Sequence, residues 1–201
     1  MRYAALVSYV ESAEFGAHRV VTAEQRKVSG RLPDEAFYAL ALYLESLKPP
    51  PNPNPFDASA RAGQQIFERE GSPGCHAPGL YTNNKLTLAK GFAPPADKPA
   101  ALDVMAVSVG TDPNLALKTR KATGYYKVSS LRGAWYRGHF FNDSSIASLE
   151  EMFDPDRLKD THEPGGWNPP GVRARAVPGH EFGLRLSPDE KRSLIAFLKT
   201  L

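Results

Sequence analysis

The chain has little cysteine and no long apolar run. Its 201 residues include one cysteine, Cys75, so an internal disulfide and a disulfide-stapled scaffold are excluded. No segment approaches the ~18 consecutive apolar residues of a membrane-spanning helix. The short apolar stretch near the N-terminus is followed closely by Glu11 and Glu14, which is unlike a signal peptide. The sequence therefore predicts no membrane span.

An excess of charge of one sign is also missing. The 25 Lys and Arg and the 22 Asp and Glu are interspersed and leave a formal net charge of +3. Runs of like charge, which bind phosphate backbones or anionic lipid, are absent, so no nucleic-acid partner is expected. The five histidines have no zinc spacing. The pair Glu150-Glu151 and the segment Thr161-His162-Glu163 have the polarity of solvated charge.

Proline and glycine are abundant, with 18 and 16 residues, so much of the backbone is expected in loops. Residues 49–56 read Pro-Pro-Pro-Asn-Pro-Asn-Pro-Phe. Proline lacks an amide donor and restricts the residue before it, which excludes helix and inner strand here. We expect a stiff linker at 49–56 and a domain boundary within it.

Helical patterns predict four helices, near residues 34–47, 57–70, 146–153 and 188–200. Asp57 has the position of an N-cap for the second, whose apolar face contains Gly63 and Phe67. Ser187-Pro188-Asp189-Glu190 is a capping box with proline at the first helical position. The fold class predicted by these patterns is mainly α.

Two of these helices have related sequences. Residues 40–47 and 194–201 both have leucine at the first, fifth and eighth positions and an aromatic residue at the fourth. One interpretation is that amphipathic helices commonly use these residues. The other is two tandem domains closed by the same helix. Residues 1–48 would then be the C-terminal remnant of a first domain that lies mostly before Met1, and 57–201 a complete second domain.

The segment Ser72-Pro73-Gly74-Cys75-His76 is one residue short of the C-x-x-C-H signature of covalent haem attachment. In that signature a cysteine thiolate forms a thioether with a haem vinyl group, and the histidine binds the iron. Cys75 and His76 therefore leave one thioether and one axial ligand possible.

Further motifs occur in a specific order over about residues 32–201. A Gly63-x-x-x-Phe67 helix precedes the Cys75-His76 site, and a terminal aromatic-leucine helix ends the chain. Between them stand Cys-His-Ala-Pro-Gly-Leu-Tyr-Thr-Asn-Asn-Lys-Leu-Thr (75–87), Val-Gly-Thr-Asp-Pro (109–113), Ser-Leu-Arg-Gly-Ala-Trp-Tyr-Arg-Gly (130–138) and Gly-His-Glu-Phe-Gly-Leu (179–184). Together they resemble the C-terminal half of bacterial di-haem cytochromes c, the group of cytochrome c peroxidases and methylamine-utilisation di-haem oxidoreductases. The resemblance implies a class I cytochrome c-like domain with long loops around a haem, preceded by the terminal helix of a truncated first domain.

The resemblance also implies roles for single residues. Cys75 matches the second haem-attaching cysteine, which implies haem c with a single thioether, and His76 matches the proximal iron ligand. Arg132 matches an arginine near the haem propionates. For the distal ligand, His180 ranks first and Met105 second, followed by Met152 and His139.

The sequence departs from the family pattern at several positions. Ser72 replaces the first cysteine, Asn142 stands at a family histidine, Ser144 at a glycine, and Ser129 where the family usually has proline. The change at Asn142 places catalysis at this site in doubt.

Two functions remain open. The first is an electron-transfer haem protein, the C-terminal portion of a di-haem peroxidase-like oxidoreductase, whose partner is a redox protein or a second haem domain. Electron transfer is then favoured over catalysis, and the family implies a periplasmic or exported location. The alternative is a degenerate, haem-free interaction module or a truncated gene product.

Overall fold

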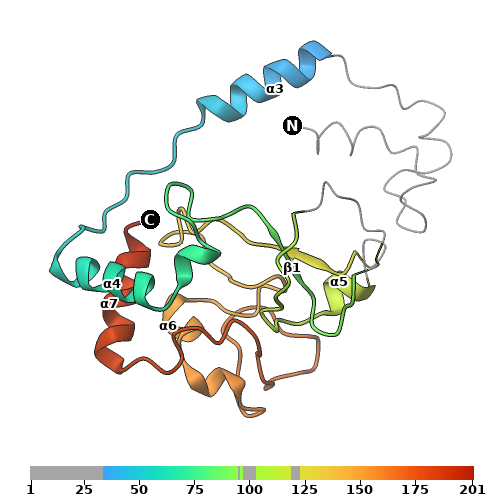
Figure 1. Cartoon of the computed structure of the whole chain (residues 1–201), viewed down its shortest axis with the longest axis vertical. Helices are drawn as coiled ribbons and strands as arrows, with labels where there is room; N and C mark the ends of the chain where they lie inside the picture. The colour runs from blue at the N-terminus through green and yellow to red at the C-terminus, as the bar shows by residue number, and fades with distance from the viewer. Residues whose placement is uncertain (1–33, 95, 97–102, 119–122) are drawn as a thin grey trace. The chain divides into compact units, whose positions relative to one another are not determined.

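The computed structural model describes residues 34–94, 96, 103–118 and 123–201 (Figure 1). The chain divides into two compact units, Met1–Pro51 and Asn52–Leu201, and the division falls inside the proline-rich segment. Of the expected first-domain remnant at 1–48, residues 1–33 lie outside the described residues.

Helix α3 (Asp34–Ser46) is the described helix of the first unit. Its leucines are exposed, with Leu40 at 37% and Leu44 at 52% of full exposure. The leucines of α7 (Pro188–Lys199) in the second unit are buried, with Leu194 at 4% and Leu198 at 5%. Related sequences thus form helices in both units, but with opposite burial of the shared leucines.

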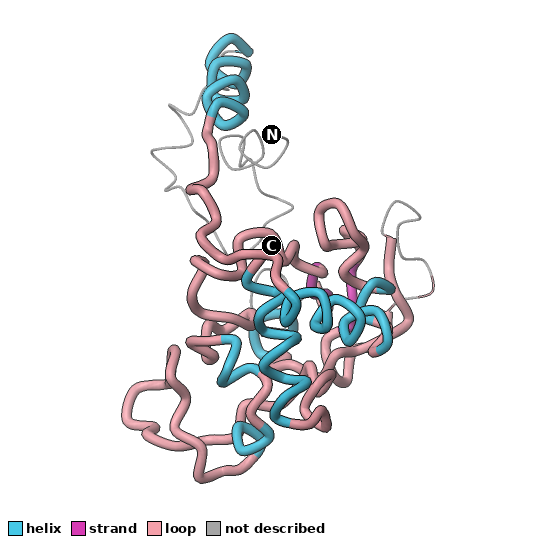
Figure 2. Tube along the Cα trace, turned by 90° about the vertical axis from the view of Figure 1, so that its left-hand side faces the viewer, coloured by secondary structure: helices cyan, strands magenta, loops and turns pink. Residues whose placement is uncertain are grey.

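Loops make up most of the second unit, as Figure 2 shows, which follows from the high content of proline and glycine. Its regular elements are short and follow the order α4 (Ala58–Arg69), η1 (Ser72–Gly74), β1 (Leu86–Leu88), α5 (Asn114–Lys118), β2 (Tyr125–Lys127), α6 (Leu149–Met152), η2 (Pro155–Leu158) and α7.

Helices α4 and α7 are the longest elements of this unit, and local capping explains where each begins. The Asp57 side chain accepts a hydrogen bond from the Ala60 amide. The Ser187 side chain accepts from the Glu190 amide, while the Glu190 side chain accepts from the Ser187 amide. Both helices therefore begin within a residue of the boundaries that the sequence predicts.

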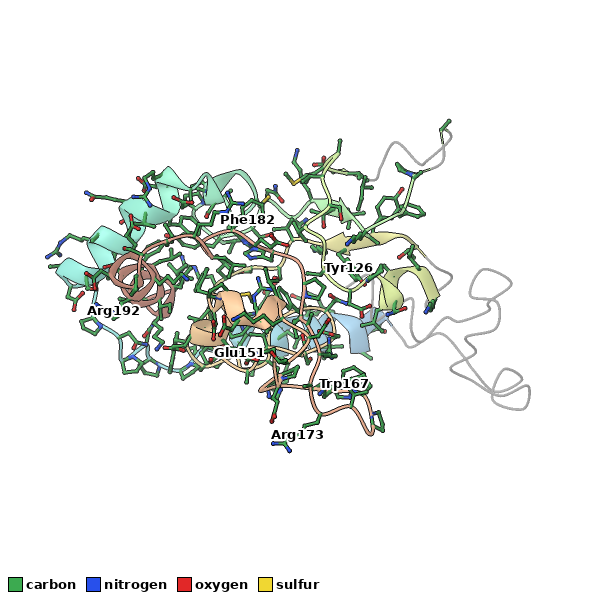
Figure 3. All side chains as sticks on the ribbon, turned by 90° about the horizontal axis from the view of Figure 1, so that it is seen from below. Tyr126, Glu151, Trp167, Arg173, Phe182 and Arg192 are labelled. Atoms are coloured by element: carbon green, nitrogen blue, oxygen red, sulfur yellow. The ribbon has the colours of Figure 1, made fainter. Side chains whose placement is uncertain are left out.

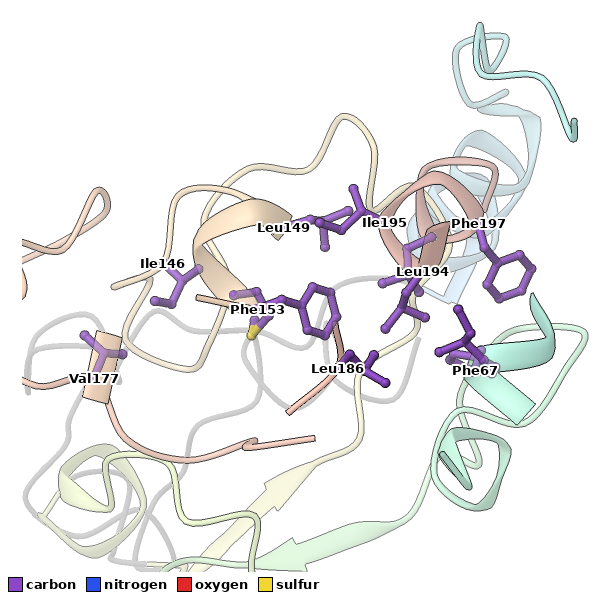
Figure 4. Close-up of a cluster of buried hydrophobic side chains, with 12 residues drawn as sticks. Phe67, Ile146, Leu149, Phe153, Val177, Leu186, Leu194, Ile195 and Phe197 are labelled. Carbon is purple, nitrogen blue, oxygen red and sulfur yellow. The ribbon is translucent and has the colours of Figure 1, made fainter. Parts of the chain in front are cut away.

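The core lies between α4, α6 and α7 (Figure 4). Phe67 of α4 packs against Phe197 of α7 with ring centres 5.4 Å apart. Burial of such apolar area is the main favourable term in folding. The twelve buried residues of this cluster are Ile66, Phe67, Ile146, Leu149, Met152, Phe153, Val177, Leu186, Leu194, Ile195, Phe197 and Leu198.

The predicted helix near 146–153 is shorter in the structure. Ser148 caps α6 by accepting a hydrogen bond from the Glu151 amide, so the helix begins at Leu149. Ile146 instead pairs with Phe140 in an isolated antiparallel bridge. The backbone pairing of Ile146 with Phe140 thus keeps the start of the predicted segment out of the helix.

Strands β1 and β2 form an antiparallel ribbon that the sequence did not predict. Leu86 pairs with Lys127, and Leu88 pairs with Tyr125. Each strand has three residues, too few for an alternating pattern to be recognised. Across the described residues, helices of the length and apolarity needed to cross a membrane are absent.

Candidate functional site

The Cys75-His76 pair lies on a tight turn directly after α4. Gly71 has φ of +73°, a left-handed conformation that glycine adopts without strain, and it ends the helical path. The Ser72 carbonyl then accepts hydrogen bonds from the amides of Cys75 (3.1 Å) and His76 (2.8 Å). The position that lacks the first cysteine therefore still shapes the turn through its backbone.

His76 is held in one tautomer by the main chain. Its Nδ1 lies 3.2 Å from the Tyr81 carbonyl oxygen, and the Ser129 carbonyl also interacts with the ring. A carbonyl can only accept, so the contact with Tyr81 assigns the proton of the neutral ring to Nδ1. Burial lowers the pKa of the imidazole below its usual value. His76 is therefore neutral near pH 7, the state that binds a metal.

His180 is delivered by the loop before α7. Its amide donates to the Val109 carbonyl at 2.6 Å, and its φ of +48° is left-handed. Within the described residues, the buried Nδ1 atom of its ring has no hydrogen-bond partner. Burial, with smaller contributions from His76 and Arg157, lowers the pKa of His180 to about 4. A second neutral imidazole with a free nitrogen thus stands in the unit.

The two imidazole rings lie close together. Their ring centres are 6.3 Å apart and their planes are inclined by 60°. An imidazole nitrogen lies about 1.2 Å from the ring centre and about 2.0 Å from a bound metal, so rings on opposite sides of one metal have centres about 6 Å apart. The observed separation fits this arrangement. The rings of Phe141 and Phe182, the latter labelled in Figure 3, flank His180 at 6.5 and 5.3 Å.

The Cys75 thiol is free and partly buried. Its Sγ lies 4.0 Å from Sδ of Met105, and the side-chain amide of Asn83 contacts the same Sδ at 3.2 Å. Asn83 also binds the turn itself, because its backbone amide donates to the Cys75 carbonyl at 2.7 Å. Met105 therefore lies beside the sulfur of Cys75 and is held there by Asn83. The sequence analysis did not single out Asn83.

Arg132 contacts the same loop from another side. Its Nε and Nη2 donate to the Gly79 carbonyl at 2.9 and 2.8 Å, and its guanidinium lies over the Tyr81 ring, 5.8 Å from the centre. This side chain is exposed. Its bidentate fork thus supports the 79–81 segment, whose Tyr81 carbonyl orients His76.

The remaining distal candidates lie elsewhere. Met152 belongs to the hydrophobic core, 9% exposed, and His139 is exposed at a left-handed backbone position. His180, ranked first from the sequence, is the candidate with a ring contact to His76.

Glu151 and His162 correct an expectation from the sequence. They are not solvated: their side chains are 13% and 12% exposed, and His162 Nε2 lies 3.0 Å from Glu151 Oε1. Glu151 also accepts the amides of Gly165 (2.9 Å) and Ala147 (2.8 Å). Its neighbour Glu150 is exposed, as expected. The sequence does not distinguish the two glutamates, because two partners of Glu151, His162 and Gly165, come from a loop that only the tertiary fold brings near.

Asn142, at the position of the family histidine, is part of a polar cluster. Its side-chain amide donates to the Asp112 carbonyl at 3.2 Å and to the Tyr126 hydroxyl at 3.1 Å. Its Oδ1 is buried and has no partner among the described residues. In this chain the residue ties the 110–114 loop to β2.

In the described ranges, groups of three or more His, Cys, Asp and Glu side chains that could hold a metal ion are absent. No family model, curated protein or solved structure matches this chain.

Proposed function

We propose that the chain is a haem-binding electron-transfer protein. Cys75 would hold haem c through one thioether, and His76 and His180 would be the two axial ligands of the iron. The observation that carries the proposal is the 6.3 Å separation of two neutral imidazole rings. Because a porphyrin supplies four nitrogen ligands, the protein needs to add only two.

The protonation states of the two rings support this assignment. The Tyr81 carbonyl fixes the proton of His76 on Nδ1, and burial lowers the pKa of both imidazoles. No proton has to leave before either ring binds a metal near pH 7. The buried, unpartnered Nδ1 of His180 has an unmet polar requirement, and iron ligation of this ring would account for its free lone pair.

The two imidazoles would also decide what kind of reaction the bound haem carries out. When bound, haem supplies a one-electron couple between ferric and ferrous iron. If both imidazoles hold the iron, they would leave no position for a peroxide substrate, so these residues would favour electron transfer over catalysis. The electron partner would be a redox protein or a second haem domain, and haem attachment would take place in a periplasmic or exported location.

The test is a pyridine haemochrome spectrum of the denatured chain after export together with a cytochrome c maturation system. We expect covalently retained haem with an α band that is red-shifted from that of a two-thioether cytochrome. Cys75→Ala should lose the covalent haem, and Ser72→Cys should move the band to the two-thioether position. Haem-free protein in every preparation would overturn the proposal.

A second candidate is a haem-free interaction module. The specific observation in its favour is the core of twelve residues, which closes between α4, α6 and α7 through apolar side chains of the protein itself. Ser72 and Asn142, which stand where the resembled family has a cysteine and a histidine, agree with this candidate. This candidate predicts that the chain without haem unfolds cooperatively and that Cys75→Ala leaves its stability and partner binding unchanged.

A further inference from the structure

Arg157 is the largest fully buried side chain among the described residues, with an exposed fraction of 0%. It lies in η2, next to α6. Its guanidinium donates four hydrogen bonds, to the carbonyl oxygens of Met152 (2.9 Å), Val177 (2.5 Å), Gly179 (2.8 Å) and His180 (3.0 Å). All four acceptors are main-chain atoms, so the side chain joins one backbone segment to another.

The charge of Arg157 is unusual for its position. Within the described part of the chain no carboxylate forms an ion pair with it, although Glu181, Glu151 and Asp154 act on it through longer-range attraction. A buried charge is costly unless strong hydrogen bonds replace its water. The bonds of a charged donor to carbonyls are of that kind. The charged guanidinium thus directs most of its hydrogen bonds to the segment 177–180.

That segment needs to be held, because its backbone is unusual. Gly179 has φ of +92°, and a Cβ atom there would lie 2.3 Å from the Thr111 nitrogen. His180 is left-handed, although it carries a side chain. On the amide side, His180 donates to Val109. The guanidinium of Arg157 binds the carbonyl oxygens of residues 177, 179 and 180.

We infer that Arg157 is a positioning residue for His180: its guanidinium fixes the 177–180 backbone so that the imidazole lies beside that of His76. This inference rests on the proposed function, because it assigns Arg157 to the axial ligand of that site. The Phe141 ring, 5.3 Å from the guanidinium carbon and 6.5 Å from the His180 ring, fills the space beside both groups.

The first test uses the absorption and electron paramagnetic resonance spectra of the haem-loaded chain. The wild type is expected to be low-spin with two histidine ligands. Arg157→Met removes all four bonds at similar size, and we expect the iron to become mainly high-spin as His180 leaves. Arg157→Lys keeps the charge and part of the bonding, so it should restore part of the low-spin signal. If Arg157 only stabilised another part of the fold, its replacement would not change the ligands of the iron.

Arg175→Met is the matched control. Arg175 is also mostly buried and belongs to the same loop, but its shortest bonds go to the side chains of Asn168 (2.6 Å) and Asp143 (3.1 Å), with longer ones to the carbonyls of Trp167 (3.4 Å) and Ala176 (3.5 Å). We expect the low-spin signal of the Arg175→Met protein to match that of the wild type. A low-spin Arg157→Met protein, or an equal loss in both variants, would overturn the inference.

A second test does not need haem. In amide hydrogen exchange of the haem-free chain, Arg157→Met should exchange the His180 and Val177 amides about 10-fold faster or more, while the Trp167 amide, bonded to the Ser144 carbonyl at 2.8 Å, changes little. If the wild type binds no haem but Arg157→Met still exchanges these two amides faster, the proposed function fails. Arg157 then still positions residues 177–180, as an anchor of the loop. Unchanged exchange at His180 overturns the inference itself.

If neither Arg157 variant folds, the wild type still decides the question. A guanidinium that makes these four bonds gives an Nε proton that exchanges slowly with water, visible in a nitrogen-proton spectrum. We expect the Arg157 Nε proton to be protected to a similar degree as the core amides of α7. Rapid exchange of this proton would contradict the inference.

Discussion

Gly63 and Ser193 bring two helices into backbone contact. A Cβ atom at Gly63 would lie 1.9 Å from the main-chain oxygen of Ser193 and 2.8 Å from the Cβ of Phe197. Only glycine leaves room for this approach of α4 and α7. The same contact places Phe67 and Phe197 against Tyr81, with ring centres 6.1 Å apart in each pair. Because the Tyr81 carbonyl orients His76, the helix crossing and the candidate site are structurally linked.

We therefore predict that Gly63→Ala lowers the free energy of unfolding by about 3 kcal/mol, since the new methyl group has to push the two helices apart. Urea denaturation followed by circular dichroism measures this change. Gly138→Ala is the matched control, because a Cβ at Gly138 meets nothing within 4 Å. Its effect should stay within about 0.5 kcal/mol. Equal stability of the two variants would show that α4 and α7 do not approach as described.

The neighbours Glu150 and Glu151 offer a second matched pair. Glu151→Ala would leave the amides of Ala147 and Gly165 without their acceptor, and we expect it to cost about 3 kcal/mol in the free energy of unfolding. Glu150→Ala removes an exposed ion pair with Lys199 and should cost less than about 1 kcal/mol. Thermal or urea unfolding measures both. A Glu150 variant that is as damaging as the Glu151 variant would contradict the buried role of Glu151.

The elements that could be predicted from the sequence are those determined by neighbouring residues. The boundaries of α4 and α7 follow from Asp57 and from the Ser187-Glu190 box, whose bonds span only three residues. These predictions depend on local chemistry, which a single sequence contains.

The rest of the site depends on contacts between distant residues. Arg157 binds the carbonyls of residues 177–180, about twenty positions later, and Asn83 contacts Met105 across a loop. A lone arginine or asparagine in a polar segment has no pattern that predicts such a role. His162 was wrongly expected in solvent for the same reason, since the partner that buries it is Glu151.

Stability should depend on pH through His180. Its pKa falls from 6.5 in the unfolded chain to about 4 in the folded one, so folding favours the neutral ring. This contribution is fully present above about pH 6.5 and is lost as the pH falls toward 4. For the chain produced without haem, we expect the stability difference between wild type and His180→Gln to shrink by about 2 kcal/mol from pH 7 to pH 4.5. Urea titrations at a series of pH values measure it, and parallel curves for the two proteins would contradict it.

The two assignments of the distal iron ligand, to Met105 or to His180, predict opposite results for single variants. Met105 Sδ already contacts the Asn83 amide and lies beside Cys75 Sγ, whereas the His180 ring lies 6.3 Å from the His76 ring. In the haem-loaded chain, Met105→Leu should therefore keep a low-spin spectrum without a thioether-to-iron band, because leucine preserves the packing volume. His180→Gln should become high-spin and gain affinity for added imidazole, which can enter the vacated position. The absorption spectrum of the ferric protein, recorded with and without imidazole, separates the two. A high-spin Met105→Leu protein together with a low-spin His180→Gln protein would assign the distal position to the methionine, since a thioether is then the ligand whose loss opens the iron.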